Sequence, residues 1–233
     1  MNAIAGGGSL ISFPALLAVG YAPVTANVTN TVALWPGYLG STARFRPELG
    51  GQRSRLLALG ATCVLGALGG TVLLLTTPSS WFSAVTPWLL LLAAALVGLQ
   101  PVIAERVRAL PGGAGEHRSV LLHASVLFGA AYGAYFGAGV SVIVLGVLGL
   151  FLPDSLHRLN ALRSVLVLVI NTIALVGFGL FGPVAWQAAA VMALASLAGG
   201  WAGASIAQRV NAAALRGSVV VIAVAVAAVM VIR

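Results

Sequence analysis

Two glycine-rich segments are the first candidates for binding chemistry in this sequence. Each places glycines just before a serine and a long apolar run, and the residues are Gly6, Gly7, Gly8 and Ser9 in one segment and Gly137, Gly139 and Ser141 in the other. A helix that starts after such a turn directs free backbone N–H groups and the positive end of its dipole outward. This favours binding of a small anion. Alternatively, the glycines serve only to let helices approach closely.

Polar side chains that follow the two glycine segments form a second candidate set. The set combines amides, a hydroxyl and a guanidinium, and it consists of Asn27, Asn30, Thr31, Asn160 and Arg163. Amides and hydroxyls donate hydrogen bonds to oxyanions, and an arginine adds a fixed charge with fork geometry. Local roles are the alternative: we expect Thr25, and either Asp154 or Ser155, to be helix N-caps. Arg163 could simply mark a membrane boundary.

The sequence offers little that could perform catalysis. All four acidic residues fall in loops or at the ends of apolar segments, and they are Glu48, Glu105, Glu116 and Asp154. His123 lies inside an apolar segment, where we expect a satisfied packing residue. The single cysteine, Cys63, excludes an intrachain disulfide and any multi-cysteine metal site. Because no known catalytic motif occurs either, we expect no enzyme activity, no cofactor and no metal.

The composition indicates a protein surrounded by lipid. Of 233 residues, 60% are hydrophobic and 7% are charged, and the mean hydropathy is +1.07. A soluble domain of this size needs more charge on its surface. The net charge of +8 comes from twelve arginines and no lysine. Because these arginines lie between apolar segments rather than on one face of a domain, we expect no nucleic-acid binding.

The apolar segments predict an all-α integral membrane protein. They lie at about 8–20, 26–43, 56–77, 85–104, 119–151, 160–180, 185–206 and 215–232. As one helix, 119–151 would be about 50 Å long, whereas the hydrocarbon core is roughly 30 Å thick. Since glycines crowd its centre, we predict a hairpin of two arms that turns near Gly137.

The arginine positions predict which side of the membrane each loop faces. Cytoplasmic loops collect arginine and lysine, and with the hairpin in place eleven of the twelve arginines share one side. As a single crossing, 119–151 would put Arg209 and Arg216 on the opposite side, which is a further reason for the hairpin. Trp81, Trp88 and Trp186 then lie near the outer boundary, as expected of an aromatic belt.

The sequence also contains a short internal repeat. Gly6, Gly8 and Ser9 match Gly137, Gly139 and Ser141 at an offset of 131 to 132 residues, and Asn27, Asn30 and Thr31 match Asn160, Arg163 and Ser164 at an offset of 133. Each half then comprises a glycine-broken helical hairpin and three transmembrane helices, an odd number that inverts the second half. We therefore predict two inverted repeats, 1–104 and 119–233, in a single transporter domain, 1–233, as is typical of secondary transporters. The first repeat lacks the first arm of its hairpin, so we expect the chain to begin late.

Several motifs are specific when taken together. In the first half they are residues 2–16 (NAIAGGGSLISFPAL), Pro23, 26–30 (ANVTN) and 35–37 (WPG), and in the second half 135–139 (YFGAG), 157–163 (HRLNALR), 182–184 (GPV) and 199–204 (GGWAGA). Over nearly the whole chain they resemble the sulfite exporter TauE/SafE family of membrane permeases. That resemblance implies transport of sulfite, organosulfonates and related small anions across the bacterial cytoplasmic membrane. Relatives often have lysine where this chain has Arg163, which keeps the charge and changes its geometry.

The leading hypothesis is therefore a multi-pass secondary transporter that holds a small anion between its two glycine turns. Its expected partners are that anion and the lipid bilayer. The alternative is a non-transporting membrane subunit that scaffolds a partner protein and uses its glycines for packing. Purification with a stoichiometric partner and without anion flux would favour the alternative.

Overall fold

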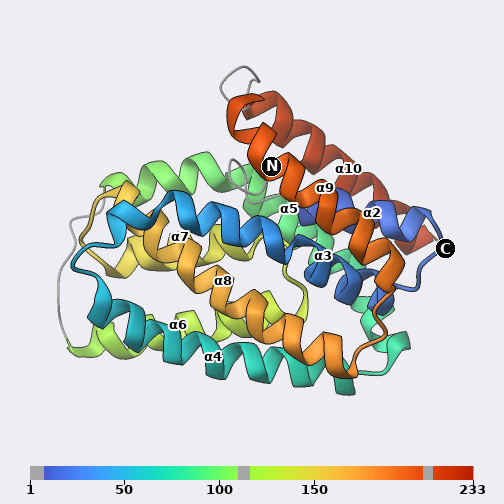
Figure 1. The fold of residues 1–233 in the computed structure, drawn as a ribbon, viewed down its shortest axis with the longest axis horizontal. Helices are drawn as coiled ribbons and strands as arrows, with labels where there is room; N and C mark the ends of the chain where they lie inside the picture. The colour runs from blue at the N-terminus through green and yellow to red at the C-terminus, as the bar shows by residue number, and fades with distance from the viewer. Residues whose placement is uncertain (1–7, 110–115, 207–211, 233) are drawn as a thin grey trace.

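The chain is helical throughout the parts that the structure describes. This computed structural model describes residues 8–109, 116–206 and 212–232, and no strand occurs among them. Figure 1 shows the arrangement of the helices. Their bounds are α2 (Ser9–Ala18), α3 (Pro23–Arg44), the 3₁₀ helix η1 (Arg46–Leu49), α4 (Arg53–Thr76), α5 (Ser79–Ala109), α6 (Glu116–Tyr135), α7 (Val140–Phe151), α8 (Leu156–Phe181), α9 (Trp186–Ile206) and α10 (Ala212–Ile232). The prediction of an all-α protein is confirmed.

The long apolar segment 119–151 is broken into two helices, α6 and α7. Between them, Gly137 and Gly139 have φ angles of +80° and +79°. Glycine adopts this left-handed conformation without the steric penalty that other residues suffer. The predicted hairpin near Gly137 is therefore confirmed, and its turn depends on glycine.

In the described chain, α4, α5 and α8 are long and apolar enough to cross a membrane. Large apolar side chains point outward from them; Leu57, Leu65 and Val72 of α4 are 66%, 65% and 57% exposed. An exposed apolar surface of this extent is expected where a protein contacts lipid. Trp81 and Trp88 near the start of α5 are exposed as well, as expected at a membrane–water boundary. The protein is an integral membrane protein.

Two helices, α3 and α8, lie in the middle of the bundle (Figure 1). They pack on each other; α4 and α6 lie on one side of this pair and α9 and α10 on the other. Close approach of α4 to α6 requires glycine, since a Cβ atom at Gly70 would lie 2.1 Å from the Ala131 carbonyl oxygen. Small residues at such crossings let membrane helices pack backbone to backbone.

The starts of the two central helices differ from each other. Helix α8 begins after Ser155, whose hydroxyl accepts a hydrogen bond from the Arg158 amide at 3.4 Å. Of the two predicted candidates, Asp154 and Ser155, the N-cap is therefore Ser155. Helix α3 begins at Pro23 with Ala22 as its N-cap, and the prediction of a cap at Thr25 is wrong. Proline is common at the first helical position, because a backbone N–H there would have no acceptor within the helix and its absence costs nothing.

Candidate functional site

The turn between α6 and α7 is held by its own residues. We call residues 136–139 the second tip. The Tyr132 hydroxyl of α6 donates a hydrogen bond to the Ala138 carbonyl oxygen at 2.8 Å, and the Val140 amide donates to the Gly137 carbonyl at 3.3 Å. Ser141, in the first turn of α7, is buried. The second tip is thus an ordered non-helical segment inside the protein.

Two of the predicted polar residues of α3, Asn27 and Thr31, lie beside the second tip. The Asn27 side-chain amide donates a hydrogen bond to the Tyr135 carbonyl oxygen at 2.8 Å. A Cβ atom at Gly137 would lie 4.0 Å from the Thr31 hydroxyl oxygen, which itself donates to the Asn27 carbonyl at 3.0 Å. The Asn27 carbonyl oxygen of the side chain is buried and has no partner among the described residues. The structure therefore brings Asn27, Thr31 and Gly137 together.

The glycine segment near the N-terminus is described from Gly8 onward, so Gly6 and Gly7 lie outside the described residues. Gly8 precedes α2, and Ser9 in its first turn is buried. The Ser12 hydroxyl lies 2.9 Å from the Gly8 carbonyl oxygen and 2.5 Å from the side-chain oxygen of Asn30, and its single proton is shared between these two acceptors. Asn30 is thereby joined to the start of α2.

The start of α2 and the second tip lie close together. The rings of Phe13 in α2 and Phe136 in the tip pack edge to face with centroids 5.5 Å apart. The Tyr132 ring lies 6.4 Å from the Phe136 ring. Aromatic side chains therefore fill part of the space between the two glycine segments in this conformation.

Arg163 is a buried cation in the central helix α8. Its side chain is 6% exposed, and its Nε has no hydrogen-bond partner among the described residues. Tyr38 of α3, also buried, is close enough to interact electrostatically with the guanidinium. The next residue, Ser164, accepts a hydrogen bond from the Thr42 hydroxyl of α3 at its carbonyl oxygen, at 3.1 Å. Arg163 thus lies at the contact between α3 and α8.

Arg163 lies at a different depth from the second tip. Along α3, Thr31 marks the depth of the tip, Tyr38 is the neighbour of the Arg163 guanidinium, and Thr42 contacts the α8 backbone beside Arg163. At 1.5 Å per residue, Tyr38 and Thr42 lie about 10 Å and about 16 Å beyond Thr31. Asn160 lies one turn further still, and its side-chain amide donates to the Leu156 carbonyl at 2.8 Å. The predicted residues therefore form two groups, one around the second tip and one around Arg163.

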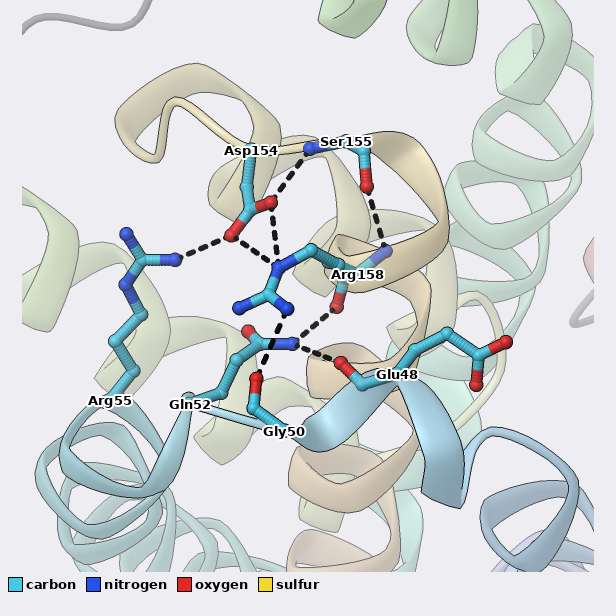
Figure 2. Close-up of polar contacts among 7 residues, drawn as sticks. All are labelled: Glu48, Gly50, Gln52, Arg55, Asp154, Ser155 and Arg158. Atoms are coloured by element: carbon cyan, nitrogen blue, oxygen red, sulfur yellow. Dashed lines mark hydrogen bonds and ion pairs between the residues drawn. The ribbon is translucent and has the colours of Figure 1, made fainter.

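A polar cluster joins the loop before α4 to the loop before α8 (Figure 2). The Asp154 carboxylate pairs with Arg55 at 2.7 Å and with Arg158 at 2.9 Å. It also accepts a hydrogen bond from the Ser155 amide at 2.8 Å. Although burial alone would raise the pKa of Asp154, this amide and the two guanidinium groups lower it below its usual value. Asp154 is therefore held as a carboxylate.

Gln52 is a buried member of the same cluster and links its two loops by hydrogen bonds. It is 0% exposed, and its side-chain amide donates to the carbonyl oxygens of Glu48 at 2.9 Å and Arg158 at 3.2 Å. The Arg158 guanidinium donates to the Gly50 carbonyl at 3.0 Å, as Figure 2 shows. These contacts fix the first turn of α8, and Arg163 follows five residues later.

Sequence reasoning missed three residues of these groups: Ser12, Tyr38 and Thr42. A serine, a tyrosine and a threonine inside apolar helices are common and give no signal of their own. Ser12 has one weak signal, because it lies one helical turn after Gly8 and so on the same face of α2. His123 is half-buried, and its Nδ1 lies 2.8 Å from the Ser119 carbonyl oxygen within its own helix.

The fold and these groups define a helical integral membrane protein whose apolar core contains a set of buried polar side chains. The chain belongs to the family described as "Sulfite exporter TauE/SafE", whose model matches residues 1–230. It is similar to a Haemophilus influenzae protein named "Probable membrane transporter protein", with 26% identity over 95% of this chain and 85% of that protein. A Sinorhizobium protein named "Probable membrane transporter protein ORF9" is 27% identical to this chain, over 97% of this chain and 85% of that protein's length. No solved structure matches the chain. The protein is a membrane transporter and not an enzyme.

Proposed function

We propose that this protein is a multi-pass secondary transporter of small oxyanions, sulfite and organosulfonates among them, in the bacterial cytoplasmic membrane. The observation that supports this most strongly is the buried guanidinium of Arg163. In the described side chains, the ion pairs all involve Asp154, so no carboxylate lies within 4 Å of Arg163.

A buried charge without a partner is strongly unfavourable in the interior of a membrane protein. Such residues are retained where they serve transport, and they usually face a substrate or ion pathway. For a cation without a carboxylate partner, an anionic substrate is the natural counter-charge. The arginine geometry suits an oxyanion, because its planar fork can donate two parallel hydrogen bonds.

Helix packing supports the proposal of two inverted repeats. Suppose that α2, α3, α4 and α5 correspond in order to α7, α8, α9 and α10. Each helix–helix contact between the halves should then have a counterpart in which the two corresponding helices pack together. Helix α4 packs on α8, and α9 packs on α3; likewise α5 packs on α7, and α10 packs on α2. The pairs α3 with α8 and α5 with α10 are each their own counterpart. This pattern is expected of a two-fold arrangement in which the substrate lies at the repeat interface.

In the proposed mechanism, the two glycine segments and the polar residues of α3 and α8 form the substrate pathway. These residues are Gly7, Gly8, Ser9, Asn27, Asn30, Thr31, Gly137, Gly139, Ser141, Asn160 and Arg163. Backbone N–H groups at the starts of α2 and α7 and side-chain amides stabilise the anion. Rocking of the repeats exposes it alternately to each side.

Uptake of radiolabelled sulfite into proteoliposomes tests this proposal. The wild-type protein should give uptake above protein-free liposomes. Replacing Gly8 and Gly139 together by leucine should abolish it, since the added side chains fill the space at both turns. Gly69→Leu is the matched control, because a Cβ atom there meets nothing within 4 Å. Equal uptake by the double variant and the control would contradict the proposed pathway. Copurification of a stoichiometric partner with no flux would favour a scaffold function instead.

A further inference from the structure

We infer that the Arg163 guanidinium forms a second anion station, separate from the glycine segments before α2 and α7, that selects oxyanions over monatomic halides. This inference rests on the proposed anion transport. It assigns a distinct role to Arg163, which the sequence groups with the tip residues into one site.

The distance along the central helices requires a separate station. The Arg163 side chain lies about 10–16 Å along α3 from the level of the second tip, because Tyr38 and Thr42 mark its depth and Thr31 marks that of the tip. A sulfite ion is only a few ångströms across, so one ion cannot touch both groups in this conformation. An anion that uses both must occupy them in turn.

The two stations differ in charge. Asn30 is neutral, and its side-chain oxygen already accepts a hydrogen bond from Ser12. Arg163, its counterpart in the sequence repeat, carries a full charge. An anion is therefore held by hydrogen bonds alone at the glycine segments. At Arg163, which lies toward the predicted cytoplasmic side, it is held by charge as well as by hydrogen bonds.

The free Nε of Arg163 supplies the selectivity. Nε and the neighbouring terminal nitrogen form one edge of the guanidinium, and this edge can donate two parallel hydrogen bonds to two oxygens of one ion. The Nε atom is buried and has no partner among the described residues. A sulfite or sulfonate group can accept both bonds, whereas chloride has a single centre. Tyr38 lies close by and adds a hydroxyl on the α3 side of the station.

Other charged groups leave this edge available. Asp154, the nearest acid along α8, is already paired with Arg55 and Arg158 (Figure 2). No other carboxylate of the described side chains forms an ion pair. Arg163 is buried in this conformation, with Tyr38 of α3 close by, so in the proposed mechanism the station loads when α3 and α8 move apart.

Equilibrium binding to the full-length protein in detergent tests the inference, with sodium sulfite and sodium chloride as probes. Wild-type protein should bind sulfite at least about tenfold more tightly than chloride, the effect of one additional charge-assisted hydrogen bond. Arg163→Lys keeps the charge but loses the fork, so it should retain chloride affinity and lose the preference for sulfite. Arg163→Gln should lose the charge-dependent binding of both ions and keep only the weaker binding of the glycine segments. Arg55→Gln removes a partly exposed arginine of the loop cluster and should leave the ratio of the two affinities unchanged.

Three results would overturn the inference. They are a wild-type protein without a preference for sulfite, an Arg163→Lys variant that keeps the preference, and an Arg55→Gln variant that loses it as the lysine variant does. The wild-type titration remains decisive if neither Arg163 variant folds. These outcomes are distinct from failure of the proposed function, which appears as wild-type protein that binds sulfite but gives no flux in proteoliposomes.

Discussion

Alanine in place of Gly139 should destabilise the protein because of the backbone at the second tip. Gly139 has a φ angle of +79° and precedes the first residue of α7. An added Cβ atom would lie 3.4 Å from the Ala93 Cα and from a methyl group of Leu96, which is close to ordinary contact. The penalty therefore comes mainly from the left-handed conformation and only slightly from crowding.

The expected magnitude follows from this conformation. A residue with a Cβ atom lowers the free energy of unfolding by about 1–2 kcal/mol when the fold forces it into the left-handed region. Gly69 of α4 is the matched control, since a Cβ atom there has nothing within 4 Å. Alanine at that helical position should raise the free energy of unfolding by up to about 1 kcal/mol. The free energies of unfolding of the two alanine variants should thus differ by roughly 1–3 kcal/mol, with opposite signs relative to wild type.

Reversible unfolding of the detergent-solubilised protein by a denaturing detergent measures both variants. Gly137→Ala should behave as Gly139→Ala does, because its φ angle is +80°. If Gly139→Ala proves as stable as Gly69→Ala, the turn does not require glycine, and the account of the second tip is refuted.

Two further predictions concern packing and the polar cluster. Gly70→Ala should lower the free energy of unfolding by about 1–3 kcal/mol, because its Cβ atom would lie 2.1 Å from the Ala131 carbonyl oxygen; Gly60→Ala, with open space around it, is the control, and equal stability of the two would contradict this packing. Asp154→Asn should cost about 1 kcal/mol at pH 7, since both arginine partners are partly exposed to solvent. Because the folded pKa of Asp154 is lowered, its stabilisation is present above the usual carboxyl pKa of about 4 and disappears as the pH falls through the folded value. The stabilities of wild type and Asp154→Asn should therefore converge in acid, and a constant difference between pH 7 and pH 3 would contradict the role of the ion pairs.

Much of the fold could be predicted because a membrane limits helix length. The apolar segments gave the helices, and the excess length of 119–151 required the turn at Gly137. Thr25 shows where local reasoning failed. It is a good capping residue in isolation, but Pro23 starts the helix two residues earlier, and a cap can act only at the residue before the helix.

The candidate site was harder to predict, for a different reason. The internal repeat shows which residues are equivalent, such as Asn30 and Arg163, but equivalent residues in two halves need not touch. Their separation depends on how α3 and α8 cross, which is determined by packing along both helices. Similarly, Ser12 and Tyr38 become functional candidates only through Asn30 and Arg163, their neighbours in space.

The dependence of sulfite flux on Arg163 tests the central claim most directly. Radiolabelled sulfite uptake should be measured in proteoliposomes that contain equal amounts of folded wild-type protein or Arg163→Gln. We expect clear uptake by wild type and uptake at the level of protein-free liposomes for the variant. Equal uptake by the two proteins would contradict an anion pathway through Arg163.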